Sequence, residues 1–338
     1  MSQALAHHNH PTGNHGDQAR STMDAETLAV LCKAASDPMR LEILRVLSHD
    51  SFGVLELAAI FSMPQPGMSH HLKVLSTAKL LVTRRQGNSI FYRRPLLDFK
   101  SQLDTFQASL FATVDRLPLL PEYVQKIETI YFERSAQSRL YFERNAARHA
   151  ENQLLLCELN QYLPNMLELV SLMQLPKAGR ILEIGPGEGT LLAELATRFE
   201  HIVALDNSEE MLALAQGQVA KKHGNITFVK DSIEAYIPGT RLFNAAALNM
   251  VLHHMASPIQ IFQKLSHILR PGGYVLIADL CLHNQEWTRI SCGDVWLGFE
   301  PGDLTLWAEE AGFTEDQSLY LGLKNGFQIQ LRLFRLAV

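Results

Sequence analysis

The stretch Ile181-Leu182-Glu183-Ile184-Gly185-Pro186-Gly187-Glu188-Gly189-Thr190 decides the fold of the second half of this chain. A run of apolar, strand-forming residues leads into three closely spaced glycines, and a helical pattern follows them. Glycine allows the backbone to turn tightly and to approach a ligand closely. The G-x-G-x-G spacing alone is a weak signal, but the strand and helix lie where a nucleotide-binding loop requires them. We therefore predict an α/β sheet built around this stretch.

Strands and helices alternate from this stretch onward. Helices should fill the gaps after the first, second and fourth strands, and such alternation is typical of a parallel sheet. The last two apolar segments, 317–323 and 327–334, are predicted to form an antiparallel hairpin. The five strands predicted before them are residues 180–184, 201–205, 226–229, 243–248 and 274–278. The second half is thus predicted to be a Rossmann-like α/β domain with a mostly parallel sheet.

Carboxylates follow the second and third predicted strands. Asp206 lies 23 residues beyond Glu183, and a carboxylate at that place can accept hydrogen bonds from both hydroxyls of an adenosine ribose. Asp231 and Ser232 follow the third strand, where they are positioned for the edge of an adenine ring. A dinucleotide site is the obvious alternative, but its loop has the spacing G-x-G-x-x-G. The glycine spacing therefore argues against a dinucleotide.

Four segments of this half resemble the motifs of class I methyltransferases that use S-adenosylmethionine (SAM). The resemblance covers about residues 135 to 338, and its segments begin at Glu183, Val203, Asn249 and Leu269. It implies that Glu183 and the glycine loop hold the methionine part of SAM or of its product S-adenosylhomocysteine (SAH). It also implies that Asp206 binds the ribose and that Asn249 lies near the methionine end. The cofactor-binding residues implied in this way are Glu183, Gly185, Gly187, Gly189, Asp206, Asn207, Asp231, Ser232 and Asn249.

No catalytic residue is assigned. Methyl transfer is an in-line displacement in which positioning and the exclusion of water do much of the work, so no particular base is obligatory. His253 and His254 could serve as a base, or they could pack and form hydrogen bonds after the fourth strand. Tyr141 and Phe142 fall where such proteins often place a helix that closes the site, but they could equally be core aromatics.

The first half of the chain is predicted to form short helices followed by a basic hairpin. Asp37 can cap a helix that begins at Pro38, because proline is tolerated in the first turn. Residues 63–67 are rich in helix breakers, and residues 68–75 form the next predicted helix. Residues 81–85 and 89–93 alternate across Gln86-Gly87-Asn88, which is typical of a hairpin. The order of these elements predicts a winged helix-turn-helix domain.

In such a domain the second helix enters the major groove, and its N-terminal residues meet base edges. The residues predicted to lie there are Gln65, Met68, Ser69 and His71. Lys73, Arg84 and Arg85 are predicted to contact phosphates, the last two from the wing. Residues 24–98 hold nine Lys and Arg against seven Asp and Glu, whereas the whole chain has a net charge of -5. A helical interaction module that never meets DNA is the alternative on charge alone.

The residues around both helices resemble the ArsR family of dimeric bacterial repressors. The resemblance rests on Asp37 to Leu44, on Met68 to Leu75 and on the basic hairpin, and it covers about residues 25 to 110. It implies a homodimer through the first and last helices that reads a palindromic operator in double-stranded DNA. Metal-sensing members often carry a Cys-x-Cys pair before the turn, but residues 54–60 contain no thiol, and soft metals require thiolates. No metal site is therefore predicted, and Cys32 is expected to be a buried small hydrophobe.

Composition limits the remaining possibilities. A chain of 338 residues suggests two domains, and 47% hydrophobic with 19% charged residues excludes disorder over most of it. Four scattered cysteines are too few for a disulfide framework, and no Cys-x-x-Cys spacing indicates zinc. No apolar run approaches the roughly 20 residues of a membrane helix, and no signal peptide is present, so a cytoplasmic protein is expected.

We predict four parts: a disordered tail (1–22), a winged helix-turn-helix and dimerisation domain (23–116), a linker with a helical cap (117–175) and a methyltransferase-like domain (176–338). The tail contains His7, His8, His10 and His15, so weak metal capture or a purification tag are its alternatives. The resemblances imply a transcriptional regulator that responds to SAM or SAH in the control of methionine and SAM-cycle genes. The alternative is an active small-molecule methyltransferase whose DNA-binding head serves autoregulation.

Overall fold

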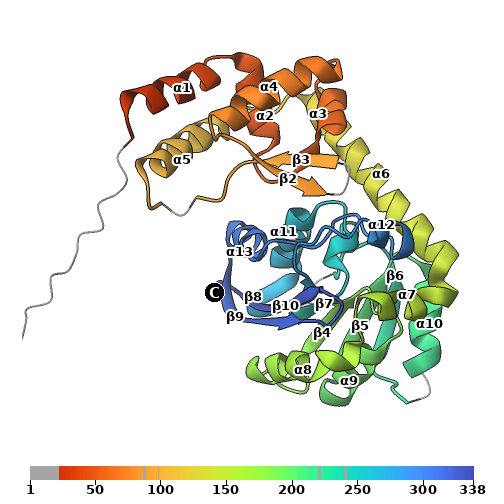
Figure 1. The fold of residues 1–338 in the computed structure, drawn as a ribbon. Helices are drawn as coiled ribbons and strands as arrows, with labels where there is room; N and C mark the ends of the chain where they lie inside the picture. Colours follow the sequence, from red (N-terminus) through yellow and green to blue (C-terminus); the bar gives the residue numbers. More distant parts are fainter. Residues whose placement is uncertain (1–22, 87–88, 98, 220–221, 240–241) are drawn as a thin grey trace, which may run out of the picture.

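The computed structural model describes residues 23–86, 89–97, 99–219, 222–239 and 242–338, so the His-rich tail lies outside the described residues. Two bodies are arranged one above the other in Figure 1, and a long helix, α6, runs along the side of both. The upper body, called the head below, contains α1–α5 and β1–β3. The lower body, called the sheet domain, contains β4–β10 and the helices that cover them. Both predicted fold classes are thus confirmed.

The head is a helical unit with a small antiparallel sheet. Its elements are α1 (Ala25–Ala35), α2 (Pro38–Val46), β1 (Phe52–Gly53), α3 (Val54–Ile60), α4 (Gln65–Thr77), β2 (Val82–Gln86), β3 (Ser89–Arg93) and α5 (Gln102–Val114). The carboxylate of Asp37 accepts a hydrogen bond of 3.1 Å from the backbone N–H of Arg40, as predicted for a cap before Pro38. The hairpin of β2 and β3 is also confirmed, and β1 adds a third strand beside β3. Apolar residues such as Leu44, Leu57 and Leu72 fill the core between the helices.

One boundary differs from the sequence predictions. Helix α4 begins at Gln65, so Pro66 and Gly67 belong to its first turn, where the missing N–H of proline costs nothing. Helix α5 begins after the cap Ser101. Within the segment predicted as a linker with a helical cap, Pro121 opens α6 (Pro121–Asn145), and the first half of that helix packs into the core of the head.

The sheet domain has seven strands in the order β6-β5-β4-β7-β8-β10-β9. The five parallel strands and the C-terminal hairpin are confirmed, and the hairpin is longer than predicted. The strands are β4 (Arg180–Ile184), β5 (His201–Asp206), β6 (Ile226–Lys230), β7 (Phe243–Asn249), β8 (Leu269–Leu280), β9 (Phe313–Gly322) and β10 (Gln328–Leu336). This order places β4 and β7 at the centre, so their carboxyl ends form the middle of one sheet edge.

Helices cover both faces of this sheet (Figure 1). One face packs against α8 (Leu163–Leu172), α9 (Thr190–Arg198) and α10 (Glu209–Val219), and the other against α11 (Pro258–Ile268) and α13 (Pro301–Glu310). The helices predicted after the first, second and fourth strands are therefore confirmed as α9, α10 and α11. The remaining helices are α7 (His149–Leu156), α12 (Trp287–Ser291) and the short turns η1 (Ala146–Arg148), η2 (Leu159–Gln161) and η3 (Leu252–His254).

None of the four cysteines forms a disulfide. Cys157, Cys281 and Cys292 are buried, but Cys32 is exposed, so the prediction of a buried Cys32 is wrong. Leu31 and Ala34 form the inner face of α1, and one residue of helix rotation turns Cys32 away from them. Within the described residues, no helix combines the length and apolar character needed to cross a membrane.

Candidate functional site

The glycine-rich loop connects β4 to α9 in a conformation that requires glycine. Gly185, Gly187 and Gly189 have φ angles of +62°, +55° and +83°, which side chains with a Cβ rarely adopt. A Cβ at Gly185 would also lie 2.6 Å from the Cγ2 of Val251. The loop therefore needs glycine for its own backbone, and it brings the N-terminus of α9 to the edge of the sheet.

A cavity of about 1070 Å³ lies at the carboxyl ends of β4, β5, β6 and β7. The carboxyl ends of parallel strands meet at one edge of a sheet, so residues far apart in sequence come together there. The predicted cofactor residues that line this cavity are Gly185, Gly187, Asp206, Asn207, Asp231, Ser232 and Asn249. Glu183 and Gly189 lie outside the lining, since Glu183 points into the protein from β4 and Gly189 caps α9.

Glu183 is a buried carboxylate beneath the glycine loop. Its side chain is 1% exposed, and its Oε2 accepts no hydrogen bond from any residue that the structure describes. Burial raises the pKa of Glu183 to about 8, because the charged form loses its hydration. A ligand with a positively charged amino group above the loop, as the methionine part of SAM or SAH has, would favour the charged form of this carboxyl group.

Asp206 ends β5 at the cavity wall. One of its oxygens accepts a hydrogen bond of 2.9 Å from the backbone N–H of Ser208, which fixes the carboxylate in place. Burial raises the pKa of Asp206 to about 6, although backbone hydrogen bonds oppose this shift. The charged residues around the cavity are mainly acidic: Glu128, Glu158, Glu188, Asp206, Asp231 and Glu234, against Arg139 and Lys230. This lining fits an adenosine ligand that carries positive charge.

Aromatic side chains line the cavity, and one of the two candidates on α6 that the sequence left undecided is among them. Phe142 on α6 lines the cavity and meets the ring of His254 edge-on at 4.8 Å. Tyr141 is not among the lining residues, and its hydroxyl donates to the carbonyl of Ser291. Tyr162, which sequence reasoning missed, lines the cavity and bonds the side-chain oxygen of Asn249 at 2.9 Å. Of the two candidates on α6, only Phe142 therefore faces the cavity.

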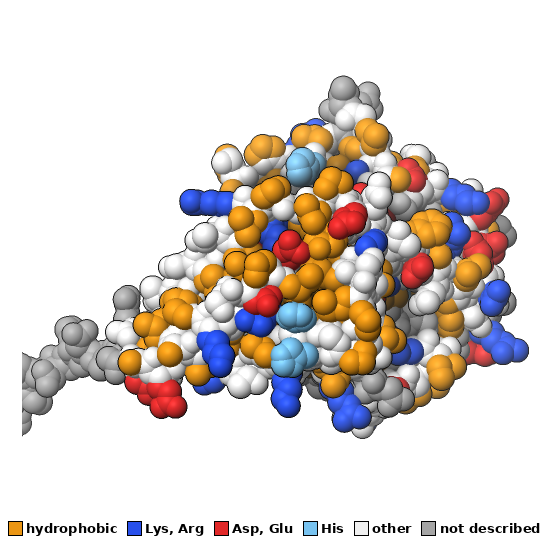
Figure 2. Space-filling model, turned by 90° about the horizontal axis from the view of Figure 1, so that it is seen from above, with side chains coloured by type: hydrophobic (Ala, Val, Ile, Leu, Met, Phe, Trp, Pro, Cys, Tyr) orange, Lys and Arg blue, Asp and Glu red, His pale blue; other side chains and the backbone are white. Residues whose placement is uncertain are grey.

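Helix α4 presents part of its predicted DNA-reading face. Gln65 and Lys73 are exposed, and Ser69 and His71 are half-buried. Met68 is fully buried in the core of the head, so the prediction that it meets a base edge is wrong. Its apolar side chain shares the inner stripe of α4 with Leu72. Seen from above, the face that carries α1 and α4 has Lys and Arg mostly at its margin and hydrophobic side chains toward the middle (Figure 2).

The wing faces the sheet domain. Arg84 is 8% exposed, donates to the carbonyl of Gly298 and lies 3.6 Å from the carboxylate of Asp303 on α13. Arg93 pairs with the same carboxylate at 2.9 Å. The prediction of a phosphate contact for Arg84 is therefore wrong in this arrangement of the two bodies, because the sheet domain occupies its guanidinium. Arg85, the next residue, is exposed.

The comparisons with known proteins give separate matches for the head and for the sheet domain. Residues 35–84 match the model of a helix-turn-helix domain, and residues 181–273 match that of a methyltransferase domain. The arsenical resistance operon repressor of Staphylococcus xylosus is 38% identical over 90 residues, which are 26% of this chain and 86% of the repressor. The ubiquinone biosynthesis O-methyltransferase of Serratia proteamaculans is 20% identical over 114 residues, 33% of this chain and 47% of the enzyme.

The sheet domain also has solved structural relatives. The 1,6-didemethyltoxoflavin-N1-methyltransferase of Burkholderia thailandensis, solved with 1,6-didemethyltoxoflavin and SAH, is similar with a TM-score of 0.50. Its sequence is 19% identical, and the match covers 62% of this chain and 91% of that one, which shows the fold alone. The chain spans about half the length of the curated ubiquinone-pathway relative.

Fold and matches together define a winged helix-turn-helix head fused to a class I SAM-dependent methyltransferase domain. Through its head, the chain belongs to the family of the arsenical resistance repressors, the ArsR family. A head of this type implies DNA binding, and a class I methyltransferase domain implies SAM binding.

Proposed function

We propose that this chain is an ArsR-type transcriptional regulator whose affinity for its operator responds to SAM or SAH bound in the sheet domain. The observation that carries the proposal is that α6 belongs to both bodies. Tyr123 and Ile130, near its start, lie in the core of the head. Ser135 and Phe142, further along the same helix, line the cavity. A ligand in the cavity therefore touches a helix whose other end is packed among the DNA-binding helices.

Two side chains of α6 connect the cavity to the head directly. Tyr131 lines the cavity, and its hydroxyl donates to the carboxylate of Asp50 in the head at 2.8 Å. Arg134 donates to both carboxylate oxygens of Glu56 on α3, at 3.0 and 2.8 Å. It also donates to the carbonyl of Ala256, a residue of the cavity wall, at 3.1 Å. Movement of the cavity wall would thus displace Arg134 and, through its bonds to Glu56, would displace α3, the helix before the turn.

The two ligands differ in charge. SAM carries a positive sulfonium, whereas SAH does not, so the acidic lining can distinguish them. A ligand shifts a two-state equilibrium only as far as its affinities for the two states differ, and a shift from 1:99 to 99:1 requires about 5.5 kcal/mol. In a homodimer two ligands share that requirement. Control of genes that consume or recycle SAM is the biological role that such a sensor would serve.

Dimerisation through α1 and α5 completes the proposal for the head. Leu28 and Val30 project from α1 with 38% and 44% of their surface exposed, and Leu103 and Leu110 on α5 are half-buried. Figure 1 shows both helices on the side of the head away from α6. Burial of these side chains in a symmetric dimer would place two α4 helices for a palindromic operator.

We propose for the individual residues the roles that the resemblance to class I methyltransferases implies. The glycine loop and Glu183 hold the methionine part of the ligand, Asp206 with Asn207 holds the ribose, and Asp231 and Ser232 flank the adenine. Asn249 lies near the methionine end. The domains are 23–116 for DNA binding and dimerisation, 117–175 for α6 and the helical cap, and 176–338 for the ligand. The packing of the first half of α6 into the head supports a close connection between the two bodies through residues 117–175.

Titration of DNA binding tests the proposal. A palindromic duplex is first selected from a random library with the full chain, and its affinity is then measured by fluorescence anisotropy without ligand, with SAM and with SAH. We expect at least one ligand to change the affinity by about tenfold or more, which corresponds to a coupling free energy of about 1.4 kcal/mol. An unchanged affinity with both ligands, at concentrations where calorimetry shows the site to be filled, contradicts the sensor.

A second candidate function is methyl transfer to a small molecule. Ligand pockets usually measure about 300–1,000 Å³, and the cavity of about 1070 Å³ is at the upper end of this range, which favours a second small molecule beside SAM. Conversion of SAM to SAH in the presence of a panel of small-molecule acceptors would support this function. Ligand binding without turnover, together with altered DNA affinity, would leave the regulator as the function.

A further inference from the structure

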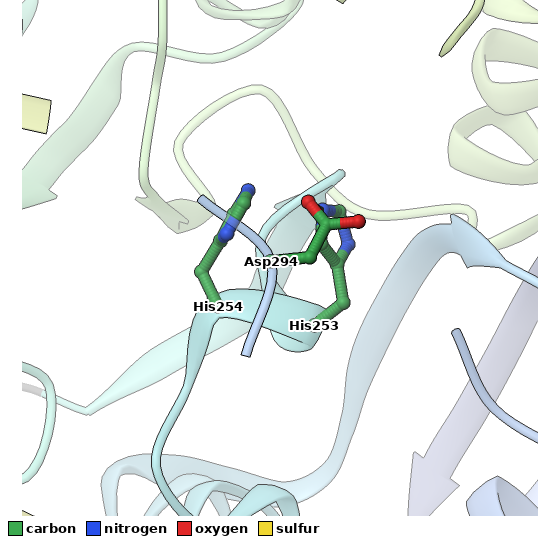
Figure 3. A group of neighbouring side chains, drawn as sticks. All are labelled: His253, His254 and Asp294. Carbon is green, nitrogen blue, oxygen red and sulfur yellow. Dashed lines mark ion pairs between the residues drawn. The ribbon is translucent and has the colours of Figure 1, made fainter. Parts of the chain in front are cut away.

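Three buried side chains lie close together at the wall of the cavity and behind it. His253 and His254 belong to η3, directly after β7, and Asp294 follows α12 (Figure 3). One ring nitrogen of each histidine and one carboxylate oxygen of Asp294 all lie within 4.8 Å of one another. His253, His254 and Asp294 are 0%, 7% and 4% exposed. Buried groups of this kind need a partner that compensates for lost hydration.

His253 is held in a fixed orientation by Asp279. Its Nδ1 lies 2.7 Å from an Asp279 oxygen, so Nδ1–H donates to that carboxylate. Asp279 is itself fixed, because it accepts hydrogen bonds from the backbone N–H groups of His253 and Leu280. The second ring nitrogen, Nε2, consequently points toward Asp294. A carboxylate–histidine pair of this kind is the usual support behind a metal-binding imidazole.

The space between His253 and Asp294 lacks a hydrogen bond. Nε2 of His253 lies 3.6 Å from Oδ1 of Asp294, which is too long for a hydrogen bond. Within the described residues, this nitrogen has no hydrogen-bond partner, and the side chain of Thr288 lies beside the carboxylate of Asp294. Two ligands that lie about 2.0–2.2 Å from one tetrahedral metal ion are themselves separated by roughly 3.3–3.6 Å. The observed separation is therefore compatible with a metal ion between these two atoms, and a ring nitrogen of His254 lies within 4.8 Å of both.

His254 completes the set and provides access. Its Nδ1 lies 3.1 Å from the carbonyl of Gly293, so the proton lies on Nδ1 and the lone pair on Nε2. His254 also lines the large cavity, whereas His253 and Asp294 lie behind it. An ion would therefore enter from the cavity and would lie at its wall.

We propose that His253, His254 and Asp294 bind one divalent transition-metal ion, with Asp279 as the positioning residue for His253. Two imidazoles and one carboxylate suit Zn²⁺, Co²⁺ or Fe²⁺. They do not suit Ca²⁺ or Mg²⁺, which prefer oxygen ligands alone, or the soft ions that prefer thiolates. The site differs in position and chemistry from the thiolate pair that the helix before the turn lacks, and it shares His254 with the wall of the proposed ligand cavity.

The competing occupant is a proton on Nε2. Burial alone would lower the pKa of His253, but the nearby carboxylates of Asp279 and Asp294 outweigh it and raise the pKa to about 9. An imidazolium between two carboxylates is therefore the outcome if no metal binds. Metal titration distinguishes a bound metal ion from a proton, because only a metal ion gives a stoichiometric complex with its own spectrum.

The experiment uses the full chain with His7, His8, His10 and His15 all changed to Gln, since the tail could also capture metal. After treatment with a chelator, Co²⁺ is titrated while its visible absorption is recorded, and Zn²⁺ is then added as a competitor. We expect one Co²⁺ per chain with a Kd below about 10 μM, and its displacement by Zn²⁺. Absence of saturable binding in this chain overturns the proposal.

Variants in the same background locate the site. Asp294→Asn should weaken Co²⁺ binding by at least about 100-fold, and Asp279→Asn by roughly 10–100-fold with a shifted absorption band. His283→Gln is the control, because His283 is half-buried and lies outside the cluster, and it should bind as the background does. Should Asp294→Asn fail to fold by circular dichroism, His254→Gln at the cavity wall replaces it. Unchanged affinity in the folded ligand variant overturns the assignment.

Discussion

Two faces of the head were predicted from the sequence to touch the same DNA, but their surroundings are opposite. The outer face presents α4, from which Gln65 and Lys73 project into solvent. The inner face presents the wing, whose Arg84 and Arg93 both meet Asp303 of the sheet domain. One of the two predicted DNA-contacting elements is thus available, and the other is held by the domain that binds the ligand. Operator binding by both elements would require the inner face to separate from the sheet domain.

Arg134 of α6 connects α3 in the head to the cavity wall of the sheet domain. Replacement by Ala leaves Glu56 without its cation and removes the bonds to Ser51 and Ala256. We expect Arg134→Ala to lower the free energy of unfolding by about 3 kcal/mol, since it breaks a mostly buried ion pair. Chemical denaturation followed by circular dichroism measures this change.

The control for this variant lies on the same helix. Arg139 is about half exposed and forms an i,i+4 pair with Glu143, so Arg139→Ala should cost only about 0.3–0.5 kcal/mol. Equal losses in both variants would show that Arg134 does not connect the two bodies. A large loss of stability in Arg134→Ala alone would indicate that the inner face couples the head to the sheet domain.

The next largest expected effect concerns ligand binding, whose influence on operator affinity is proposed to pass through the inner face. Asp206→Asn removes the charged acceptor for the ribose hydroxyls, and we expect SAH affinity to fall by about 2 kcal/mol, roughly 30-fold. If the faces are coupled, the ligand concentration that changes operator affinity should rise by the same factor. Calorimetry and anisotropy measure the two numbers, and Asp316→Asn, on the exposed strand β9, is the control.

The same carboxylate predicts a pH dependence. Burial raises the pKa of Asp206 to about 6, so its acceptor form is lost as the pH falls through 6. Affinity of the wild-type chain for SAH should therefore decrease between pH 7.5 and 5.5, and Asp206→Asn should lack this component. The same slope in both proteins would place the titrating group elsewhere.

The sequence revealed those parts of this comparison that depend on local patterns. Asp37 before Pro38 marks a helix start, and the glycine loop after Glu183 marks a strand-to-helix turn, because each signal lies within a few residues. No local pattern in the sequence indicated the contacts of the inner face. Arg84 donates to the carbonyl of Gly298, 214 residues away, and nothing near Arg84 distinguishes an arginine that will bind a protein carbonyl from one that will bind a phosphate.

The same reasoning explains the other differences. Met68 looked available because it stands at the N-terminal end of a recognition helix, but the stripe that it shares with Leu72 is the buried one. Asp294 and His253 lie 41 positions apart with no motif between them, so only the folded chain shows that they face each other. The sequence therefore predicts which helix, strand or turn a residue belongs to, but it does not predict which residues of another element the side chain contacts.

On the outer face, the test is a substitution in α4. Gln65→Ala should weaken binding of the selected operator by about 1–2 kcal/mol, roughly tenfold, because Gln can pair with two atoms of an adenine edge. Binding to unrelated DNA should remain unchanged, since a base contact carries sequence information and a phosphate contact does not. Thr77→Ala, an exposed residue at the opposite end of α4, is the control. Equal loss on both DNAs would assign Gln65 to the backbone.

The smallest expected effect is a gain of DNA affinity. Asp303→Asn keeps the shape of the side chain but removes the negative charge that both wing arginines meet. Release of the wing should strengthen operator binding by about 1 kcal/mol, roughly fivefold. It should also steepen the dependence of log K on log salt by up to about 2, because two more cations become available for phosphates.

The control for Asp303→Asn is a second contact between the same two bodies. His49 lies 3.1 Å from Glu310, and both side chains are partly exposed, so Glu310→Gln should change operator affinity by less than about 1 kcal/mol and leave the salt slope unaltered. If Asp303→Asn raises the affinity and steepens the slope while Glu310→Gln does neither, the wing itself reaches DNA after release. If both variants leave the slope unchanged, the outer face binds the operator alone, and the wing is a permanent part of the contact with the sheet domain.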